Sequence, residues 1–209
     1  MRNSESRLKA SKSPDRQLYL GFANTMHNYG SDEPRDDLRN LPDLIAWLRK
    51  AGAITDRDAR RLLQKASDRP QEATTTFKQA IALREAIYRI FSAAVKGAAP
   101  EVTDLAVFNS ALSEALAHSR IAAMANGFVW EWRGEEKVSL ERLLWPIVRS
   151  AANFLTSGEV ARLKECAGKD CTWLFIDKSK NQTRRWCDMK GCGNRAKWRR
   201  HYERKRLAR

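Results

Sequence analysis

Four cysteines near the end of the chain constrain its fold more than any other feature. They form two pairs, Cys166 with Cys171 and Cys187 with Cys192, with four residues inside each pair and 15 residues between the pairs. Each pair can supply two thiolates from one tight loop, and the segment between them brings the chain back to the same point. The spacing predicts one tetrahedral Zn²⁺ held by all four cysteines.

We expect this zinc to be structural. Four thiolates complete the tetrahedron and leave no open position for a reactive water, which argues against catalytic zinc. Two disulfides are the other alternative, but they need an oxidising compartment, and the polar, basic residues 1–13 do not resemble a secretory signal. His201 is interpreted as a surface or phosphate-contacting residue rather than a ligand. Zinc binding would supply on the order of 10 kcal/mol of folding free energy to so small a region.

The positive charge is concentrated in the same region. The whole chain has a formal net charge of +14. Residues 159–209 contain 16 Lys and Arg against 6 Asp and Glu, a net charge of +10, whereas the first 158 residues carry only +4. Such asymmetry indicates a specialised segment that binds polyanions. A membrane surface is the weaker interpretation, because the segment has no continuous apolar face and the chain has no run of ~18 apolar residues.

The last residues of the chain suggest how a nucleic acid could be bound. Residues 194–209 contain no Pro or internal Gly, and on a helix their charges fall on two opposite sides. A helix that is polar all round either bridges solvent or binds something. A solvated basic tail is the alternative. The candidate nucleic-acid-binding residues are basic residues on this helix or next to the second cysteine pair: Arg184, Arg185, Lys190, Arg195, Lys197, Arg199, Arg200 and Arg204.

The preceding region reads as a mainly helical α+β domain. Residues 1–16 are predicted to be a flexible basic tail, residues 17–158 a domain for sensing or oligomerisation, and residues 159–209 the finger, with Gly158 at the boundary. Apolar periodicity and capping residues predict helices over 40–52, from Thr55 onwards, over 70–97, 103–117 and 139–155, the last kinked at Pro146. After residue 117 the apolar residues no longer follow a helical period, which predicts a hairpin of two strands, 121–124 and 128–133.

Two polar residues interrupt the apolar pattern of this domain. Arg84 lies on the apolar stripe predicted for helix 70–97, with Phe77, Ile81, Tyr88, Phe91 and Val95. A buried charge there must be paired or reach water. Arg84 could read an anionic effector, or it could form an internal ion pair with Asp36 or Asp37. Asn24 allows the same two interpretations, as an effector contact or as a local turn residue.

The amino-acid sequence of the cysteine region resembles that of a known family. The run from Cys166 through CTWLFIDKSKNQTRRWC to the residues Cys192-Gly193-Asn194-Arg195 resembles the CGNR zinc finger, which takes its name from those four residues. The order of GFANT, LREAIY and a hairpin before the finger is similar to the ABATE domain that accompanies it. The resemblance implies a bacterial, stress-linked transcription regulator with a mixed helix and strand N-terminal domain and no catalytic activity. The residues around the cysteines, an apolar run at 172–176 and a helix after Cys192, independently predict a treble-clef-like zinc finger.

These observations favour a cytoplasmic DNA-binding transcription regulator. Its cofactor would be one structural Zn²⁺, and its N-terminal domain could sense a small-molecule effector through Asn24 and Arg84. RNA binding is the main alternative, with Trp198 or Tyr202 stacking on bases. An enzyme carrying a localising finger is the weaker one, because the sequence shows no Gly-rich phosphate loop and no nucleophile–base pair. A homodimer would suit a two-fold symmetric operator.

Overall fold

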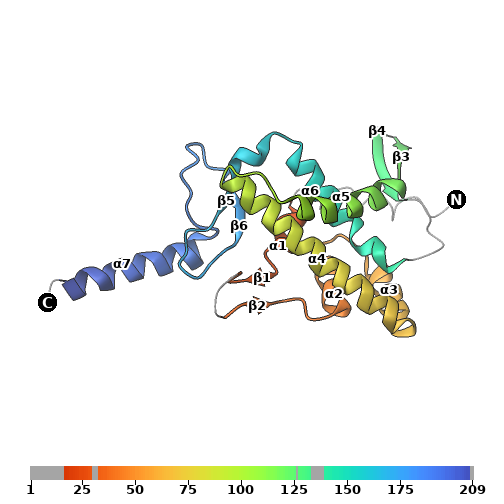
Figure 1. The fold of residues 1–209 in the computed structure, drawn as a ribbon, viewed down its shortest axis with the longest axis horizontal. Helices are drawn as coiled ribbons and strands as arrows, with labels where there is room; N and C mark the ends of the chain where they lie inside the picture. Colours follow the sequence, from red (N-terminus) through yellow and green to blue (C-terminus); the bar gives the residue numbers. More distant parts are fainter. Residues whose placement is uncertain (1–16, 30–32, 126, 133–138, 208–209) are drawn as a thin grey trace.

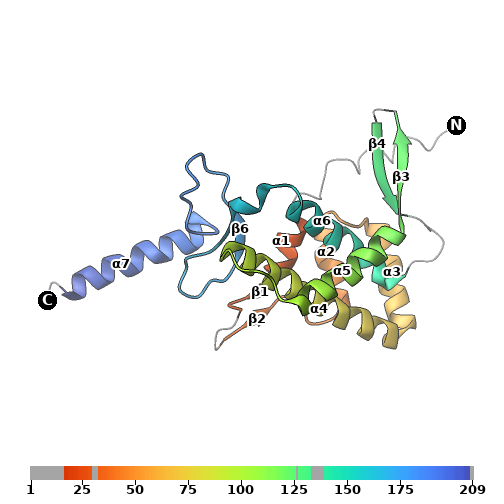
Figure 2. The same cartoon turned by 45° about the horizontal axis from the view of Figure 1, so that its top comes forward.

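The computed structural model describes residues 17–29, 33–125, 127–132 and 139–207. The predicted tail of residues 1–16 lies outside these ranges. The described chain forms a helical body and a smaller C-terminal region, from which the last helix projects away from the body (Figure 1). Figure 2 shows the same arrangement from a second side, with the β3–β4 hairpin at the end of the molecule opposite this helix.

Helices make up most of the described structure, and the strands pair only in short antiparallel hairpins. The α-helices are α1 (Leu18–Ala23), α2 (Leu41–Lys50), α3 (Asp56–Asp68), α4 (Pro70–Val95), α5 (Val102–Ala117), α6 (Trp145–Leu155) and α7 (Asn194–Leu207). The hairpins are β1 (Met26–His27) with β2 (Arg35–Asp36), β3 (Ser119–Met124) with β4 (Gly127–Trp132), and β5 (Leu163–Glu165) with β6 (Leu174–Ile176). This is the mainly helical α+β fold that the sequence predicts.

Capping residues explain where several predicted helices begin and end. The Asn40 side chain accepts a hydrogen bond from the Asp43 amide (2.9 Å) and starts α2. Thr55 and Asp58 form a reciprocal capping box that starts α3, as predicted. Gly97 adopts the left-handed conformation (φ 66°) just beyond α4, where a side chain would be strained. The hairpin predicted near residues 121–133 is also confirmed.

The predicted helix over 139–155 is wrong in one respect. The structure has a 3₁₀ turn, Leu140–Leu143, followed by α6, so Pro146 lies in the first turn of a helix and does not kink a longer one. The proline ring fits there because the first-turn N–H groups have no partner within the helix. The short helix α1 was not predicted, since its six residues span too few turns to show periodicity.

The buried side of α4 differs from the predicted stripe. Tyr88 and Phe91 are buried, but Phe77, Ile81 and Val95 are only half-buried. Helix α4 packs against α1, α2 and α3 as well as α5. Its buried surface is therefore wider than a single stripe, and several of its most buried residues are not those of the predicted stripe. Its fully buried positions are Thr76, Ala80, Leu83, Arg84, Ala86, Ile87 and Phe91.

The main hydrophobic core extends into the C-terminal region. Tyr19 of α1 stacks on Phe154 of α6 at 4.8 Å and meets the edge of Phe91 of α4 at 5.0 Å. Leu163 of β5 and Leu174 of β6 belong to the same core. The β5–β6 hairpin is therefore packed on the helical body, although it follows the predicted boundary at Gly158. Within the described residues, no helix has the length and hydropathy needed to cross a lipid bilayer.

Candidate metal centre and nucleic-acid interface

The four cysteines converge from separate parts of the C-terminal region. Cys166 follows β5 directly, and Cys171 lies further along the loop between β5 and β6. Cys187 lies after the long loop that leaves β6, and Cys192 lies in the single π-helical turn (Met189–Gly193) that leads into α7. One ligand atom from each cysteine lies within 4.8 Å of the others. The spacing of the pairs thus brings four thiols together, as the sequence predicts.

The sulfur geometry fits one zinc ion. The Sγ atoms of Cys171 and Cys187 are 3.7 Å apart, as are those of Cys187 and Cys192. Four sulfurs at about 2.3 Å from a tetrahedral Zn²⁺ are about 3.8 Å from one another. All four cysteines are free of disulfides. The cluster therefore has the donor set and the size of a structural Cys₄ zinc site, and zinc would join the loops that carry the four ligands.

The backbone around the cluster is adapted to the sulfurs. A Cβ at Gly168 would lie 3.1 Å from the Cys171 Cβ and 3.4 Å from the Cys192 Sγ, so the loop passes too close for a side chain. The Cys187 amide donates to the Cys166 Sγ (3.3 Å), and the Arg195 guanidinium donates to the Cys192 Sγ (3.0 Å). Such donors stabilise thiolates, the form that binds metal.

The thiol pKa values show why the cluster needs a cation. Burial raises the pKa of Cys171 to about 12, with a further contribution from the neighbouring cysteines. Burial and the same neighbours also raise the pKa of Cys187. The pKa of Cys166 is lowered, because amide donors from Cys187 and Gly168 outweigh its burial. Four thiolates cannot share this volume without positive charge, which a bound Zn²⁺ would supply.

A buried aspartate organises the loop between β6 and Cys187. Asp177 has no exposed surface, and its carboxylate accepts hydrogen bonds from Lys164 Nζ (2.7 Å), the Ser179 amide and hydroxyl, and the Arg184 amide. Burial would raise the pKa of Asp177, but Lys164 and the other donors outweigh it and hold this pKa far below its usual range.

The Arg184 side chain forms its hydrogen bonds within the same loop. Its Nε donates to the Trp186 carbonyl (2.8 Å), its second nitrogen donates to the Cys187 carbonyl, and its guanidinium lies over the Phe175 ring at 4.8 Å. These contacts make Arg184 a structural residue of the finger. It was predicted as a nucleic-acid contact, but its donors already hold the backbone that presents Cys187.

Helix α7 begins next to the four cysteines and projects away from the rest of the molecule. A Cβ at Gly193 would lie 2.9 Å from the Met189 Sδ, so a larger residue in the turn before the helix would displace the exposed Met189 side chain. Ala196 is buried, but every described side chain from Lys197 to Arg206 is exposed. The rings of Trp198 and Tyr202 are 62% and 64% exposed and stack at 6.1 Å.

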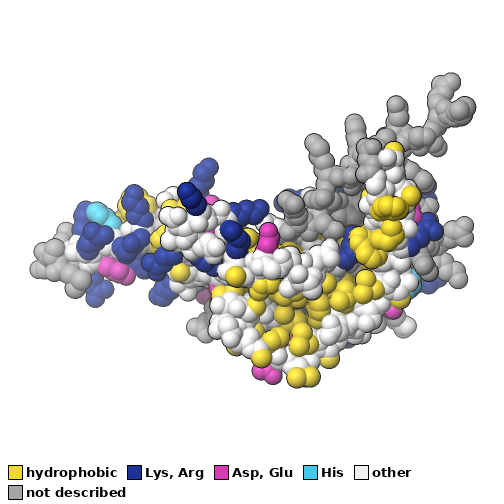
Figure 3. All heavy atoms as spheres, turned by 90° about the horizontal axis from the view of Figure 1, so that it is seen from above, with side chains coloured by type: hydrophobic (Ala, Val, Ile, Leu, Met, Phe, Trp, Pro, Cys, Tyr) yellow, Lys and Arg dark blue, Asp and Glu magenta, His cyan; other side chains and the backbone are white. Residues whose placement is uncertain are grey.

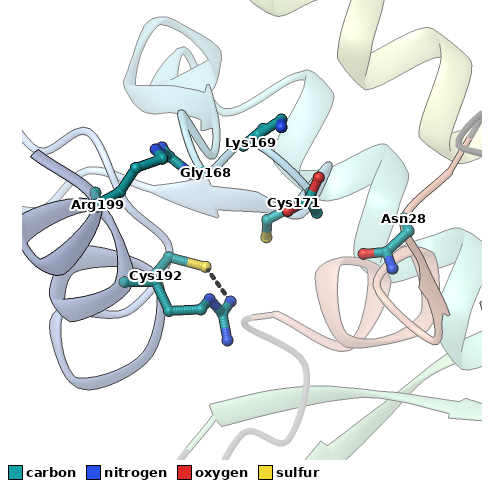
Figure 4. Close-up of a pocket in the computed structure, with 9 residues that line it drawn as sticks. Asn28, Gly168, Lys169, Cys171, Cys192 and Arg199 are labelled. Carbon is teal, nitrogen blue, oxygen red and sulfur yellow. Dashed lines mark hydrogen bonds between the residues drawn. The ribbon is translucent and has the colours of Figure 1, made fainter. Parts of the chain in front are cut away.

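The remaining predicted contact residues lie around this helix. Arg195 and Arg199 line a cavity of about 320 Å³ together with Lys169 and Asp170. Figure 4 shows Lys169 and Arg199 on the finger side of this cavity and Asn28 of the N-terminal domain across it. Arg200 lies 6.0 Å from the Trp186 ring, and Arg185 lies 5.5 Å from it. The other predicted residues, Lys190, Lys197 and Arg204, are exposed.

The sequence analysis missed Lys169 and Asn28 as neighbours of this cavity. Lys169 lies between the first two cysteines, so its position in the metal loop was a usable signal. Asn28 gave no such signal, because it is at least 140 residues in the chain from the finger residues that line this cavity and only the fold brings it there. His201 lies beside Trp198 on α7 and is not one of the four clustered ligands.

The two residues predicted to contact an effector form internal contacts. Arg84 is 1% exposed and forms a bidentate ion pair with Asp36 (2.6 and 2.7 Å), with a further hydrogen bond to the Thr25 hydroxyl (3.1 Å). Asn24 donates to the Leu174 carbonyl and accepts from the Leu174 amide, both at 2.9 Å. Arg84 thus has the ion pair that the sequence analysis left as its alternative, and Asn24 joins α1 to β6.

Comparisons with known proteins cover nearly the whole described chain. The model of the ABATE family, described as "Putative stress-induced transcription regulator", matches residues 16–158. The model of the CGNR zinc finger matches residues 162–205. No curated protein matches the chain. Neither family is an enzyme family, and the second match includes all four clustered cysteines. The chain therefore belongs to the ABATE family and carries a CGNR zinc finger after its ABATE domain.

Proposed function

We propose that this protein is a transcription regulator that binds duplex DNA through α7 and the zinc-held loops at its base. The observation that carries the proposal is the exposure of α7. Seven of its 14 residues are Lys or Arg and one is Glu, and beyond Ala196 its described side chains pack on no core. Seven positive charges on one isolated helix repel one another unless a polyanion neutralises them.

The arrangement of these charges suits a phosphate backbone. Arg195 and Arg199 are one turn apart and share their cavity with Lys169, so three cations face the space at the start of α7. The positive end of a helix dipole favours phosphate at the same place. Lys197, Arg200 and Arg204 lie on the other side of the helix, which would meet the second wall of a major groove. Arg184 is left out of this contact set because its donors are used within the finger.

The test is duplex binding measured by fluorescence anisotropy over a series of salt concentrations. The variant Lys197→Ala/Arg199→Ala/Arg204→Ala, which spares the Arg195 contact to Cys192, should bind about 100-fold more weakly, and its slope of log K against log salt should fall by about 2 to 3. The control variant Arg57→Ala/Arg60→Ala/Arg61→Ala removes the same charge from the exposed side of α3. Equal losses in both triple variants would mean that net charge, and not α7, binds the duplex.

RNA binding is the second candidate, and the exposed stack of Trp198 and Tyr202 favours it. Aromatic rings on a basic surface stack on unpaired bases and contribute roughly 1–3 kcal/mol for each base. Matched DNA and RNA ligands, duplex and single-stranded, at one salt concentration separate the two functions. Tighter binding to single-stranded RNA, lost in Trp198→Leu, would replace the DNA proposal.

We also propose that the ABATE domain provides the regulatory input, and that the protein acts in the cytoplasm of bacteria under stress. The family description supports the regulatory role. Asn24 lines a cavity of about 460 Å³ between α1 and the finger, with Trp173 and Arg184. An effector bound there would touch both domains. Arg84 does not line this cavity, so Asn24 is the residue to test. If Asn24 contacts the effector, Asn24→Ala loses effector affinity, and calorimetry with candidate anions measures that loss.

A further inference from the structure

The exposed hydrophobic side chains of the protein are concentrated in one segment. Of the twelve large hydrophobic side chains that are exposed in the described residues, eight lie between residues 102 and 130, on α5, β3 and β4. Phe128 is 78% exposed, Ile121 55% and Trp130 51%. Single exposed apolar residues are ordinary, but a contiguous group of this kind marks an interaction site.

The β3–β4 hairpin turns its apolar face outward. The register pairs Ile121 with Trp130 and Ala123 with Phe128, so these residues share one face of the hairpin. Trp132, on the same face at the base of the hairpin, packs against Trp145 of α6 at 5.5 Å. The opposite face carries the ion pair between Arg120 and Glu131 (2.7 Å). The apolar face therefore continues from the core to the tip, where the described chain leaves it uncovered.

A groove of mixed polarity lies beside this hairpin. Its volume is about 670 Å³. Apolar side chains that include Leu83 of α4, Ala111 of α5 and Trp145 of α6 line it, together with the polar Gln79, Ser110, Glu114 and Glu141. Val107 and Leu116 of α5 are also exposed. Figure 3 shows hydrophobic side chains on the hairpin and across the middle of the same face, whereas the Lys and Arg side chains of α7 lie at the other end. The projecting β3–β4 hairpin and the groove thus lie on one surface, and Trp145 contacts the hairpin and also lines the groove.

We propose that a second copy of this chain covers this surface and forms a two-fold symmetric homodimer through α5 and the β3–β4 hairpin. A surface that has both a projection and a recess can pair with itself, each hairpin lying against the groove of the other copy. The two outer edges of the hairpin also have unpaired backbone groups, and antiparallel edge pairing is itself two-fold symmetric.

The area of the surface agrees with a dimer. Aromatic side chains carry roughly 150–250 Å² each, so the exposed fractions of Phe128 and Trp130 leave roughly 200–300 Å² of apolar surface on these two residues. Ile121 on the same face, Val107 and Leu116 of α5 and the groove bring this surface towards the roughly 800 Å² that each partner contributes to a standard interface, whereas Met124 and Val129 lie on the opposite face of the hairpin.

Charge and composition favour a second copy over the rest of the same chain. The described hairpin and the lining of the groove contain Glu114, Glu131 and Glu141 against Arg120, a net charge of −2 in a chain of net charge +14. Two copies of so basic a chain repel each other least where they meet at this face. Residues 1–16 and 133–138 are mostly charged and polar by sequence, so they offer no matching apolar segment. In such a dimer the two α7 helices point away from the interface, so the dimer could hold two separate duplex segments.

Sedimentation and light scattering of the full-length protein over micromolar concentrations test this proposal. The wild-type protein should be a dimer, and Phe128→Ser/Trp130→Ser should dissociate about 100-fold more readily. The control Leu63→Ser removes an exposed side chain from α3 and should leave the dimer intact. A wild-type monomer throughout, or a double variant that still dimerises, would overturn the proposal.

Amide hydrogen exchange of the wild-type protein gives a second test that needs no variant. Exchange of the β3 and β4 amides should slow as the protein concentration rises, while exchange in α7 stays constant. Exchange rates in the hairpin that do not depend on concentration would contradict the interface even where a dimer is seen. A monomer that instead retains an unrelated protein on this face would assign the surface to that partner.

Discussion

The helical body and the zinc finger are stabilised by different physical means. In the body, aliphatic and aromatic side chains from α1, α2, α4 and α6 form a continuous core, and burial of apolar surface supplies the free energy. In the finger, the second hydrophobic cluster consists of Cys166, Phe175 and Cys192, with a few half-buried neighbours. Its loops are held by thiols, by Asp177 and by Arg184. In the finger, hydrogen bonds of Asp177 and Arg184 together with one bound Zn²⁺ would position α7, although the exposed part of α7 packs on no hydrophobic core.

The comparison predicts that metal removal separates the two regions. Chelation, or the variant Cys187→Ser, should remove about 10 kcal/mol of stabilisation from the finger, because metal binding is its main source of folding free energy. The wild-type protein should contain one Zn²⁺ per chain by elemental analysis. After metal loss, α7 and the loops should lose amide protection, while the body still unfolds cooperatively on heating. Return of protection when Zn²⁺ is added back is the control, and a finger that stays ordered without metal would break the comparison.

Arg84 tests the opposite case, a charge inside the apolar body. The variant Arg84→Met leaves Asp36 without its partner, and breaking a buried ion pair costs about 3–5 kcal/mol. Asp36 is 28% exposed, so we expect a value near the lower limit, measured by urea unfolding. Arg49→Met, which breaks the exposed pair of Arg49 with Asp56, should cost less than about 1 kcal/mol. Equal effects of the two variants would show that the Arg84 pair contributes no more than a surface pair.

Asp177 should give the smallest effect, confined to the finger. Its pKa in the folded protein is below the ordinary value, so its ionised form adds stability above about pH 4, the usual aspartate pKa. That stability is lost as the pH falls through the lower, folded pKa. Asp177→Asn should therefore increase amide exchange between residues 177 and 187 at neutral pH and remove this acid dependence. Lys178→Gln, an exposed neighbour, serves as the control, and an unchanged loop would contradict the role of Asp177.

Part of the fold followed from local sequence. Thr55, Asn40 and Gly97 mark helix ends through their own hydrogen bonds or backbone conformation, so the helix bounds were predictable. The cysteine spacing likewise predicted the metal cluster, because each pair acts within one short loop. The polar Arg84 was recognisable as an exception, and an ion pair with Asp36 or Asp37 was one of its two interpretations; only the fold, which brings Asp36 from 48 residues away, decided between them.

The sequence by itself determined the metal ligands, the concentration of positive charge and the helical class of the body, because these depend on residue type and short spacing. Only the tertiary structure decided that Arg84 pairs with Asp36, that Asn24 binds the backbone of β6, and that Arg184 is occupied within the finger. It also decided which apolar side chains stay exposed on the β3–β4 hairpin. These outcomes depend on which distant segments pack together, and a periodic pattern does not specify its neighbour.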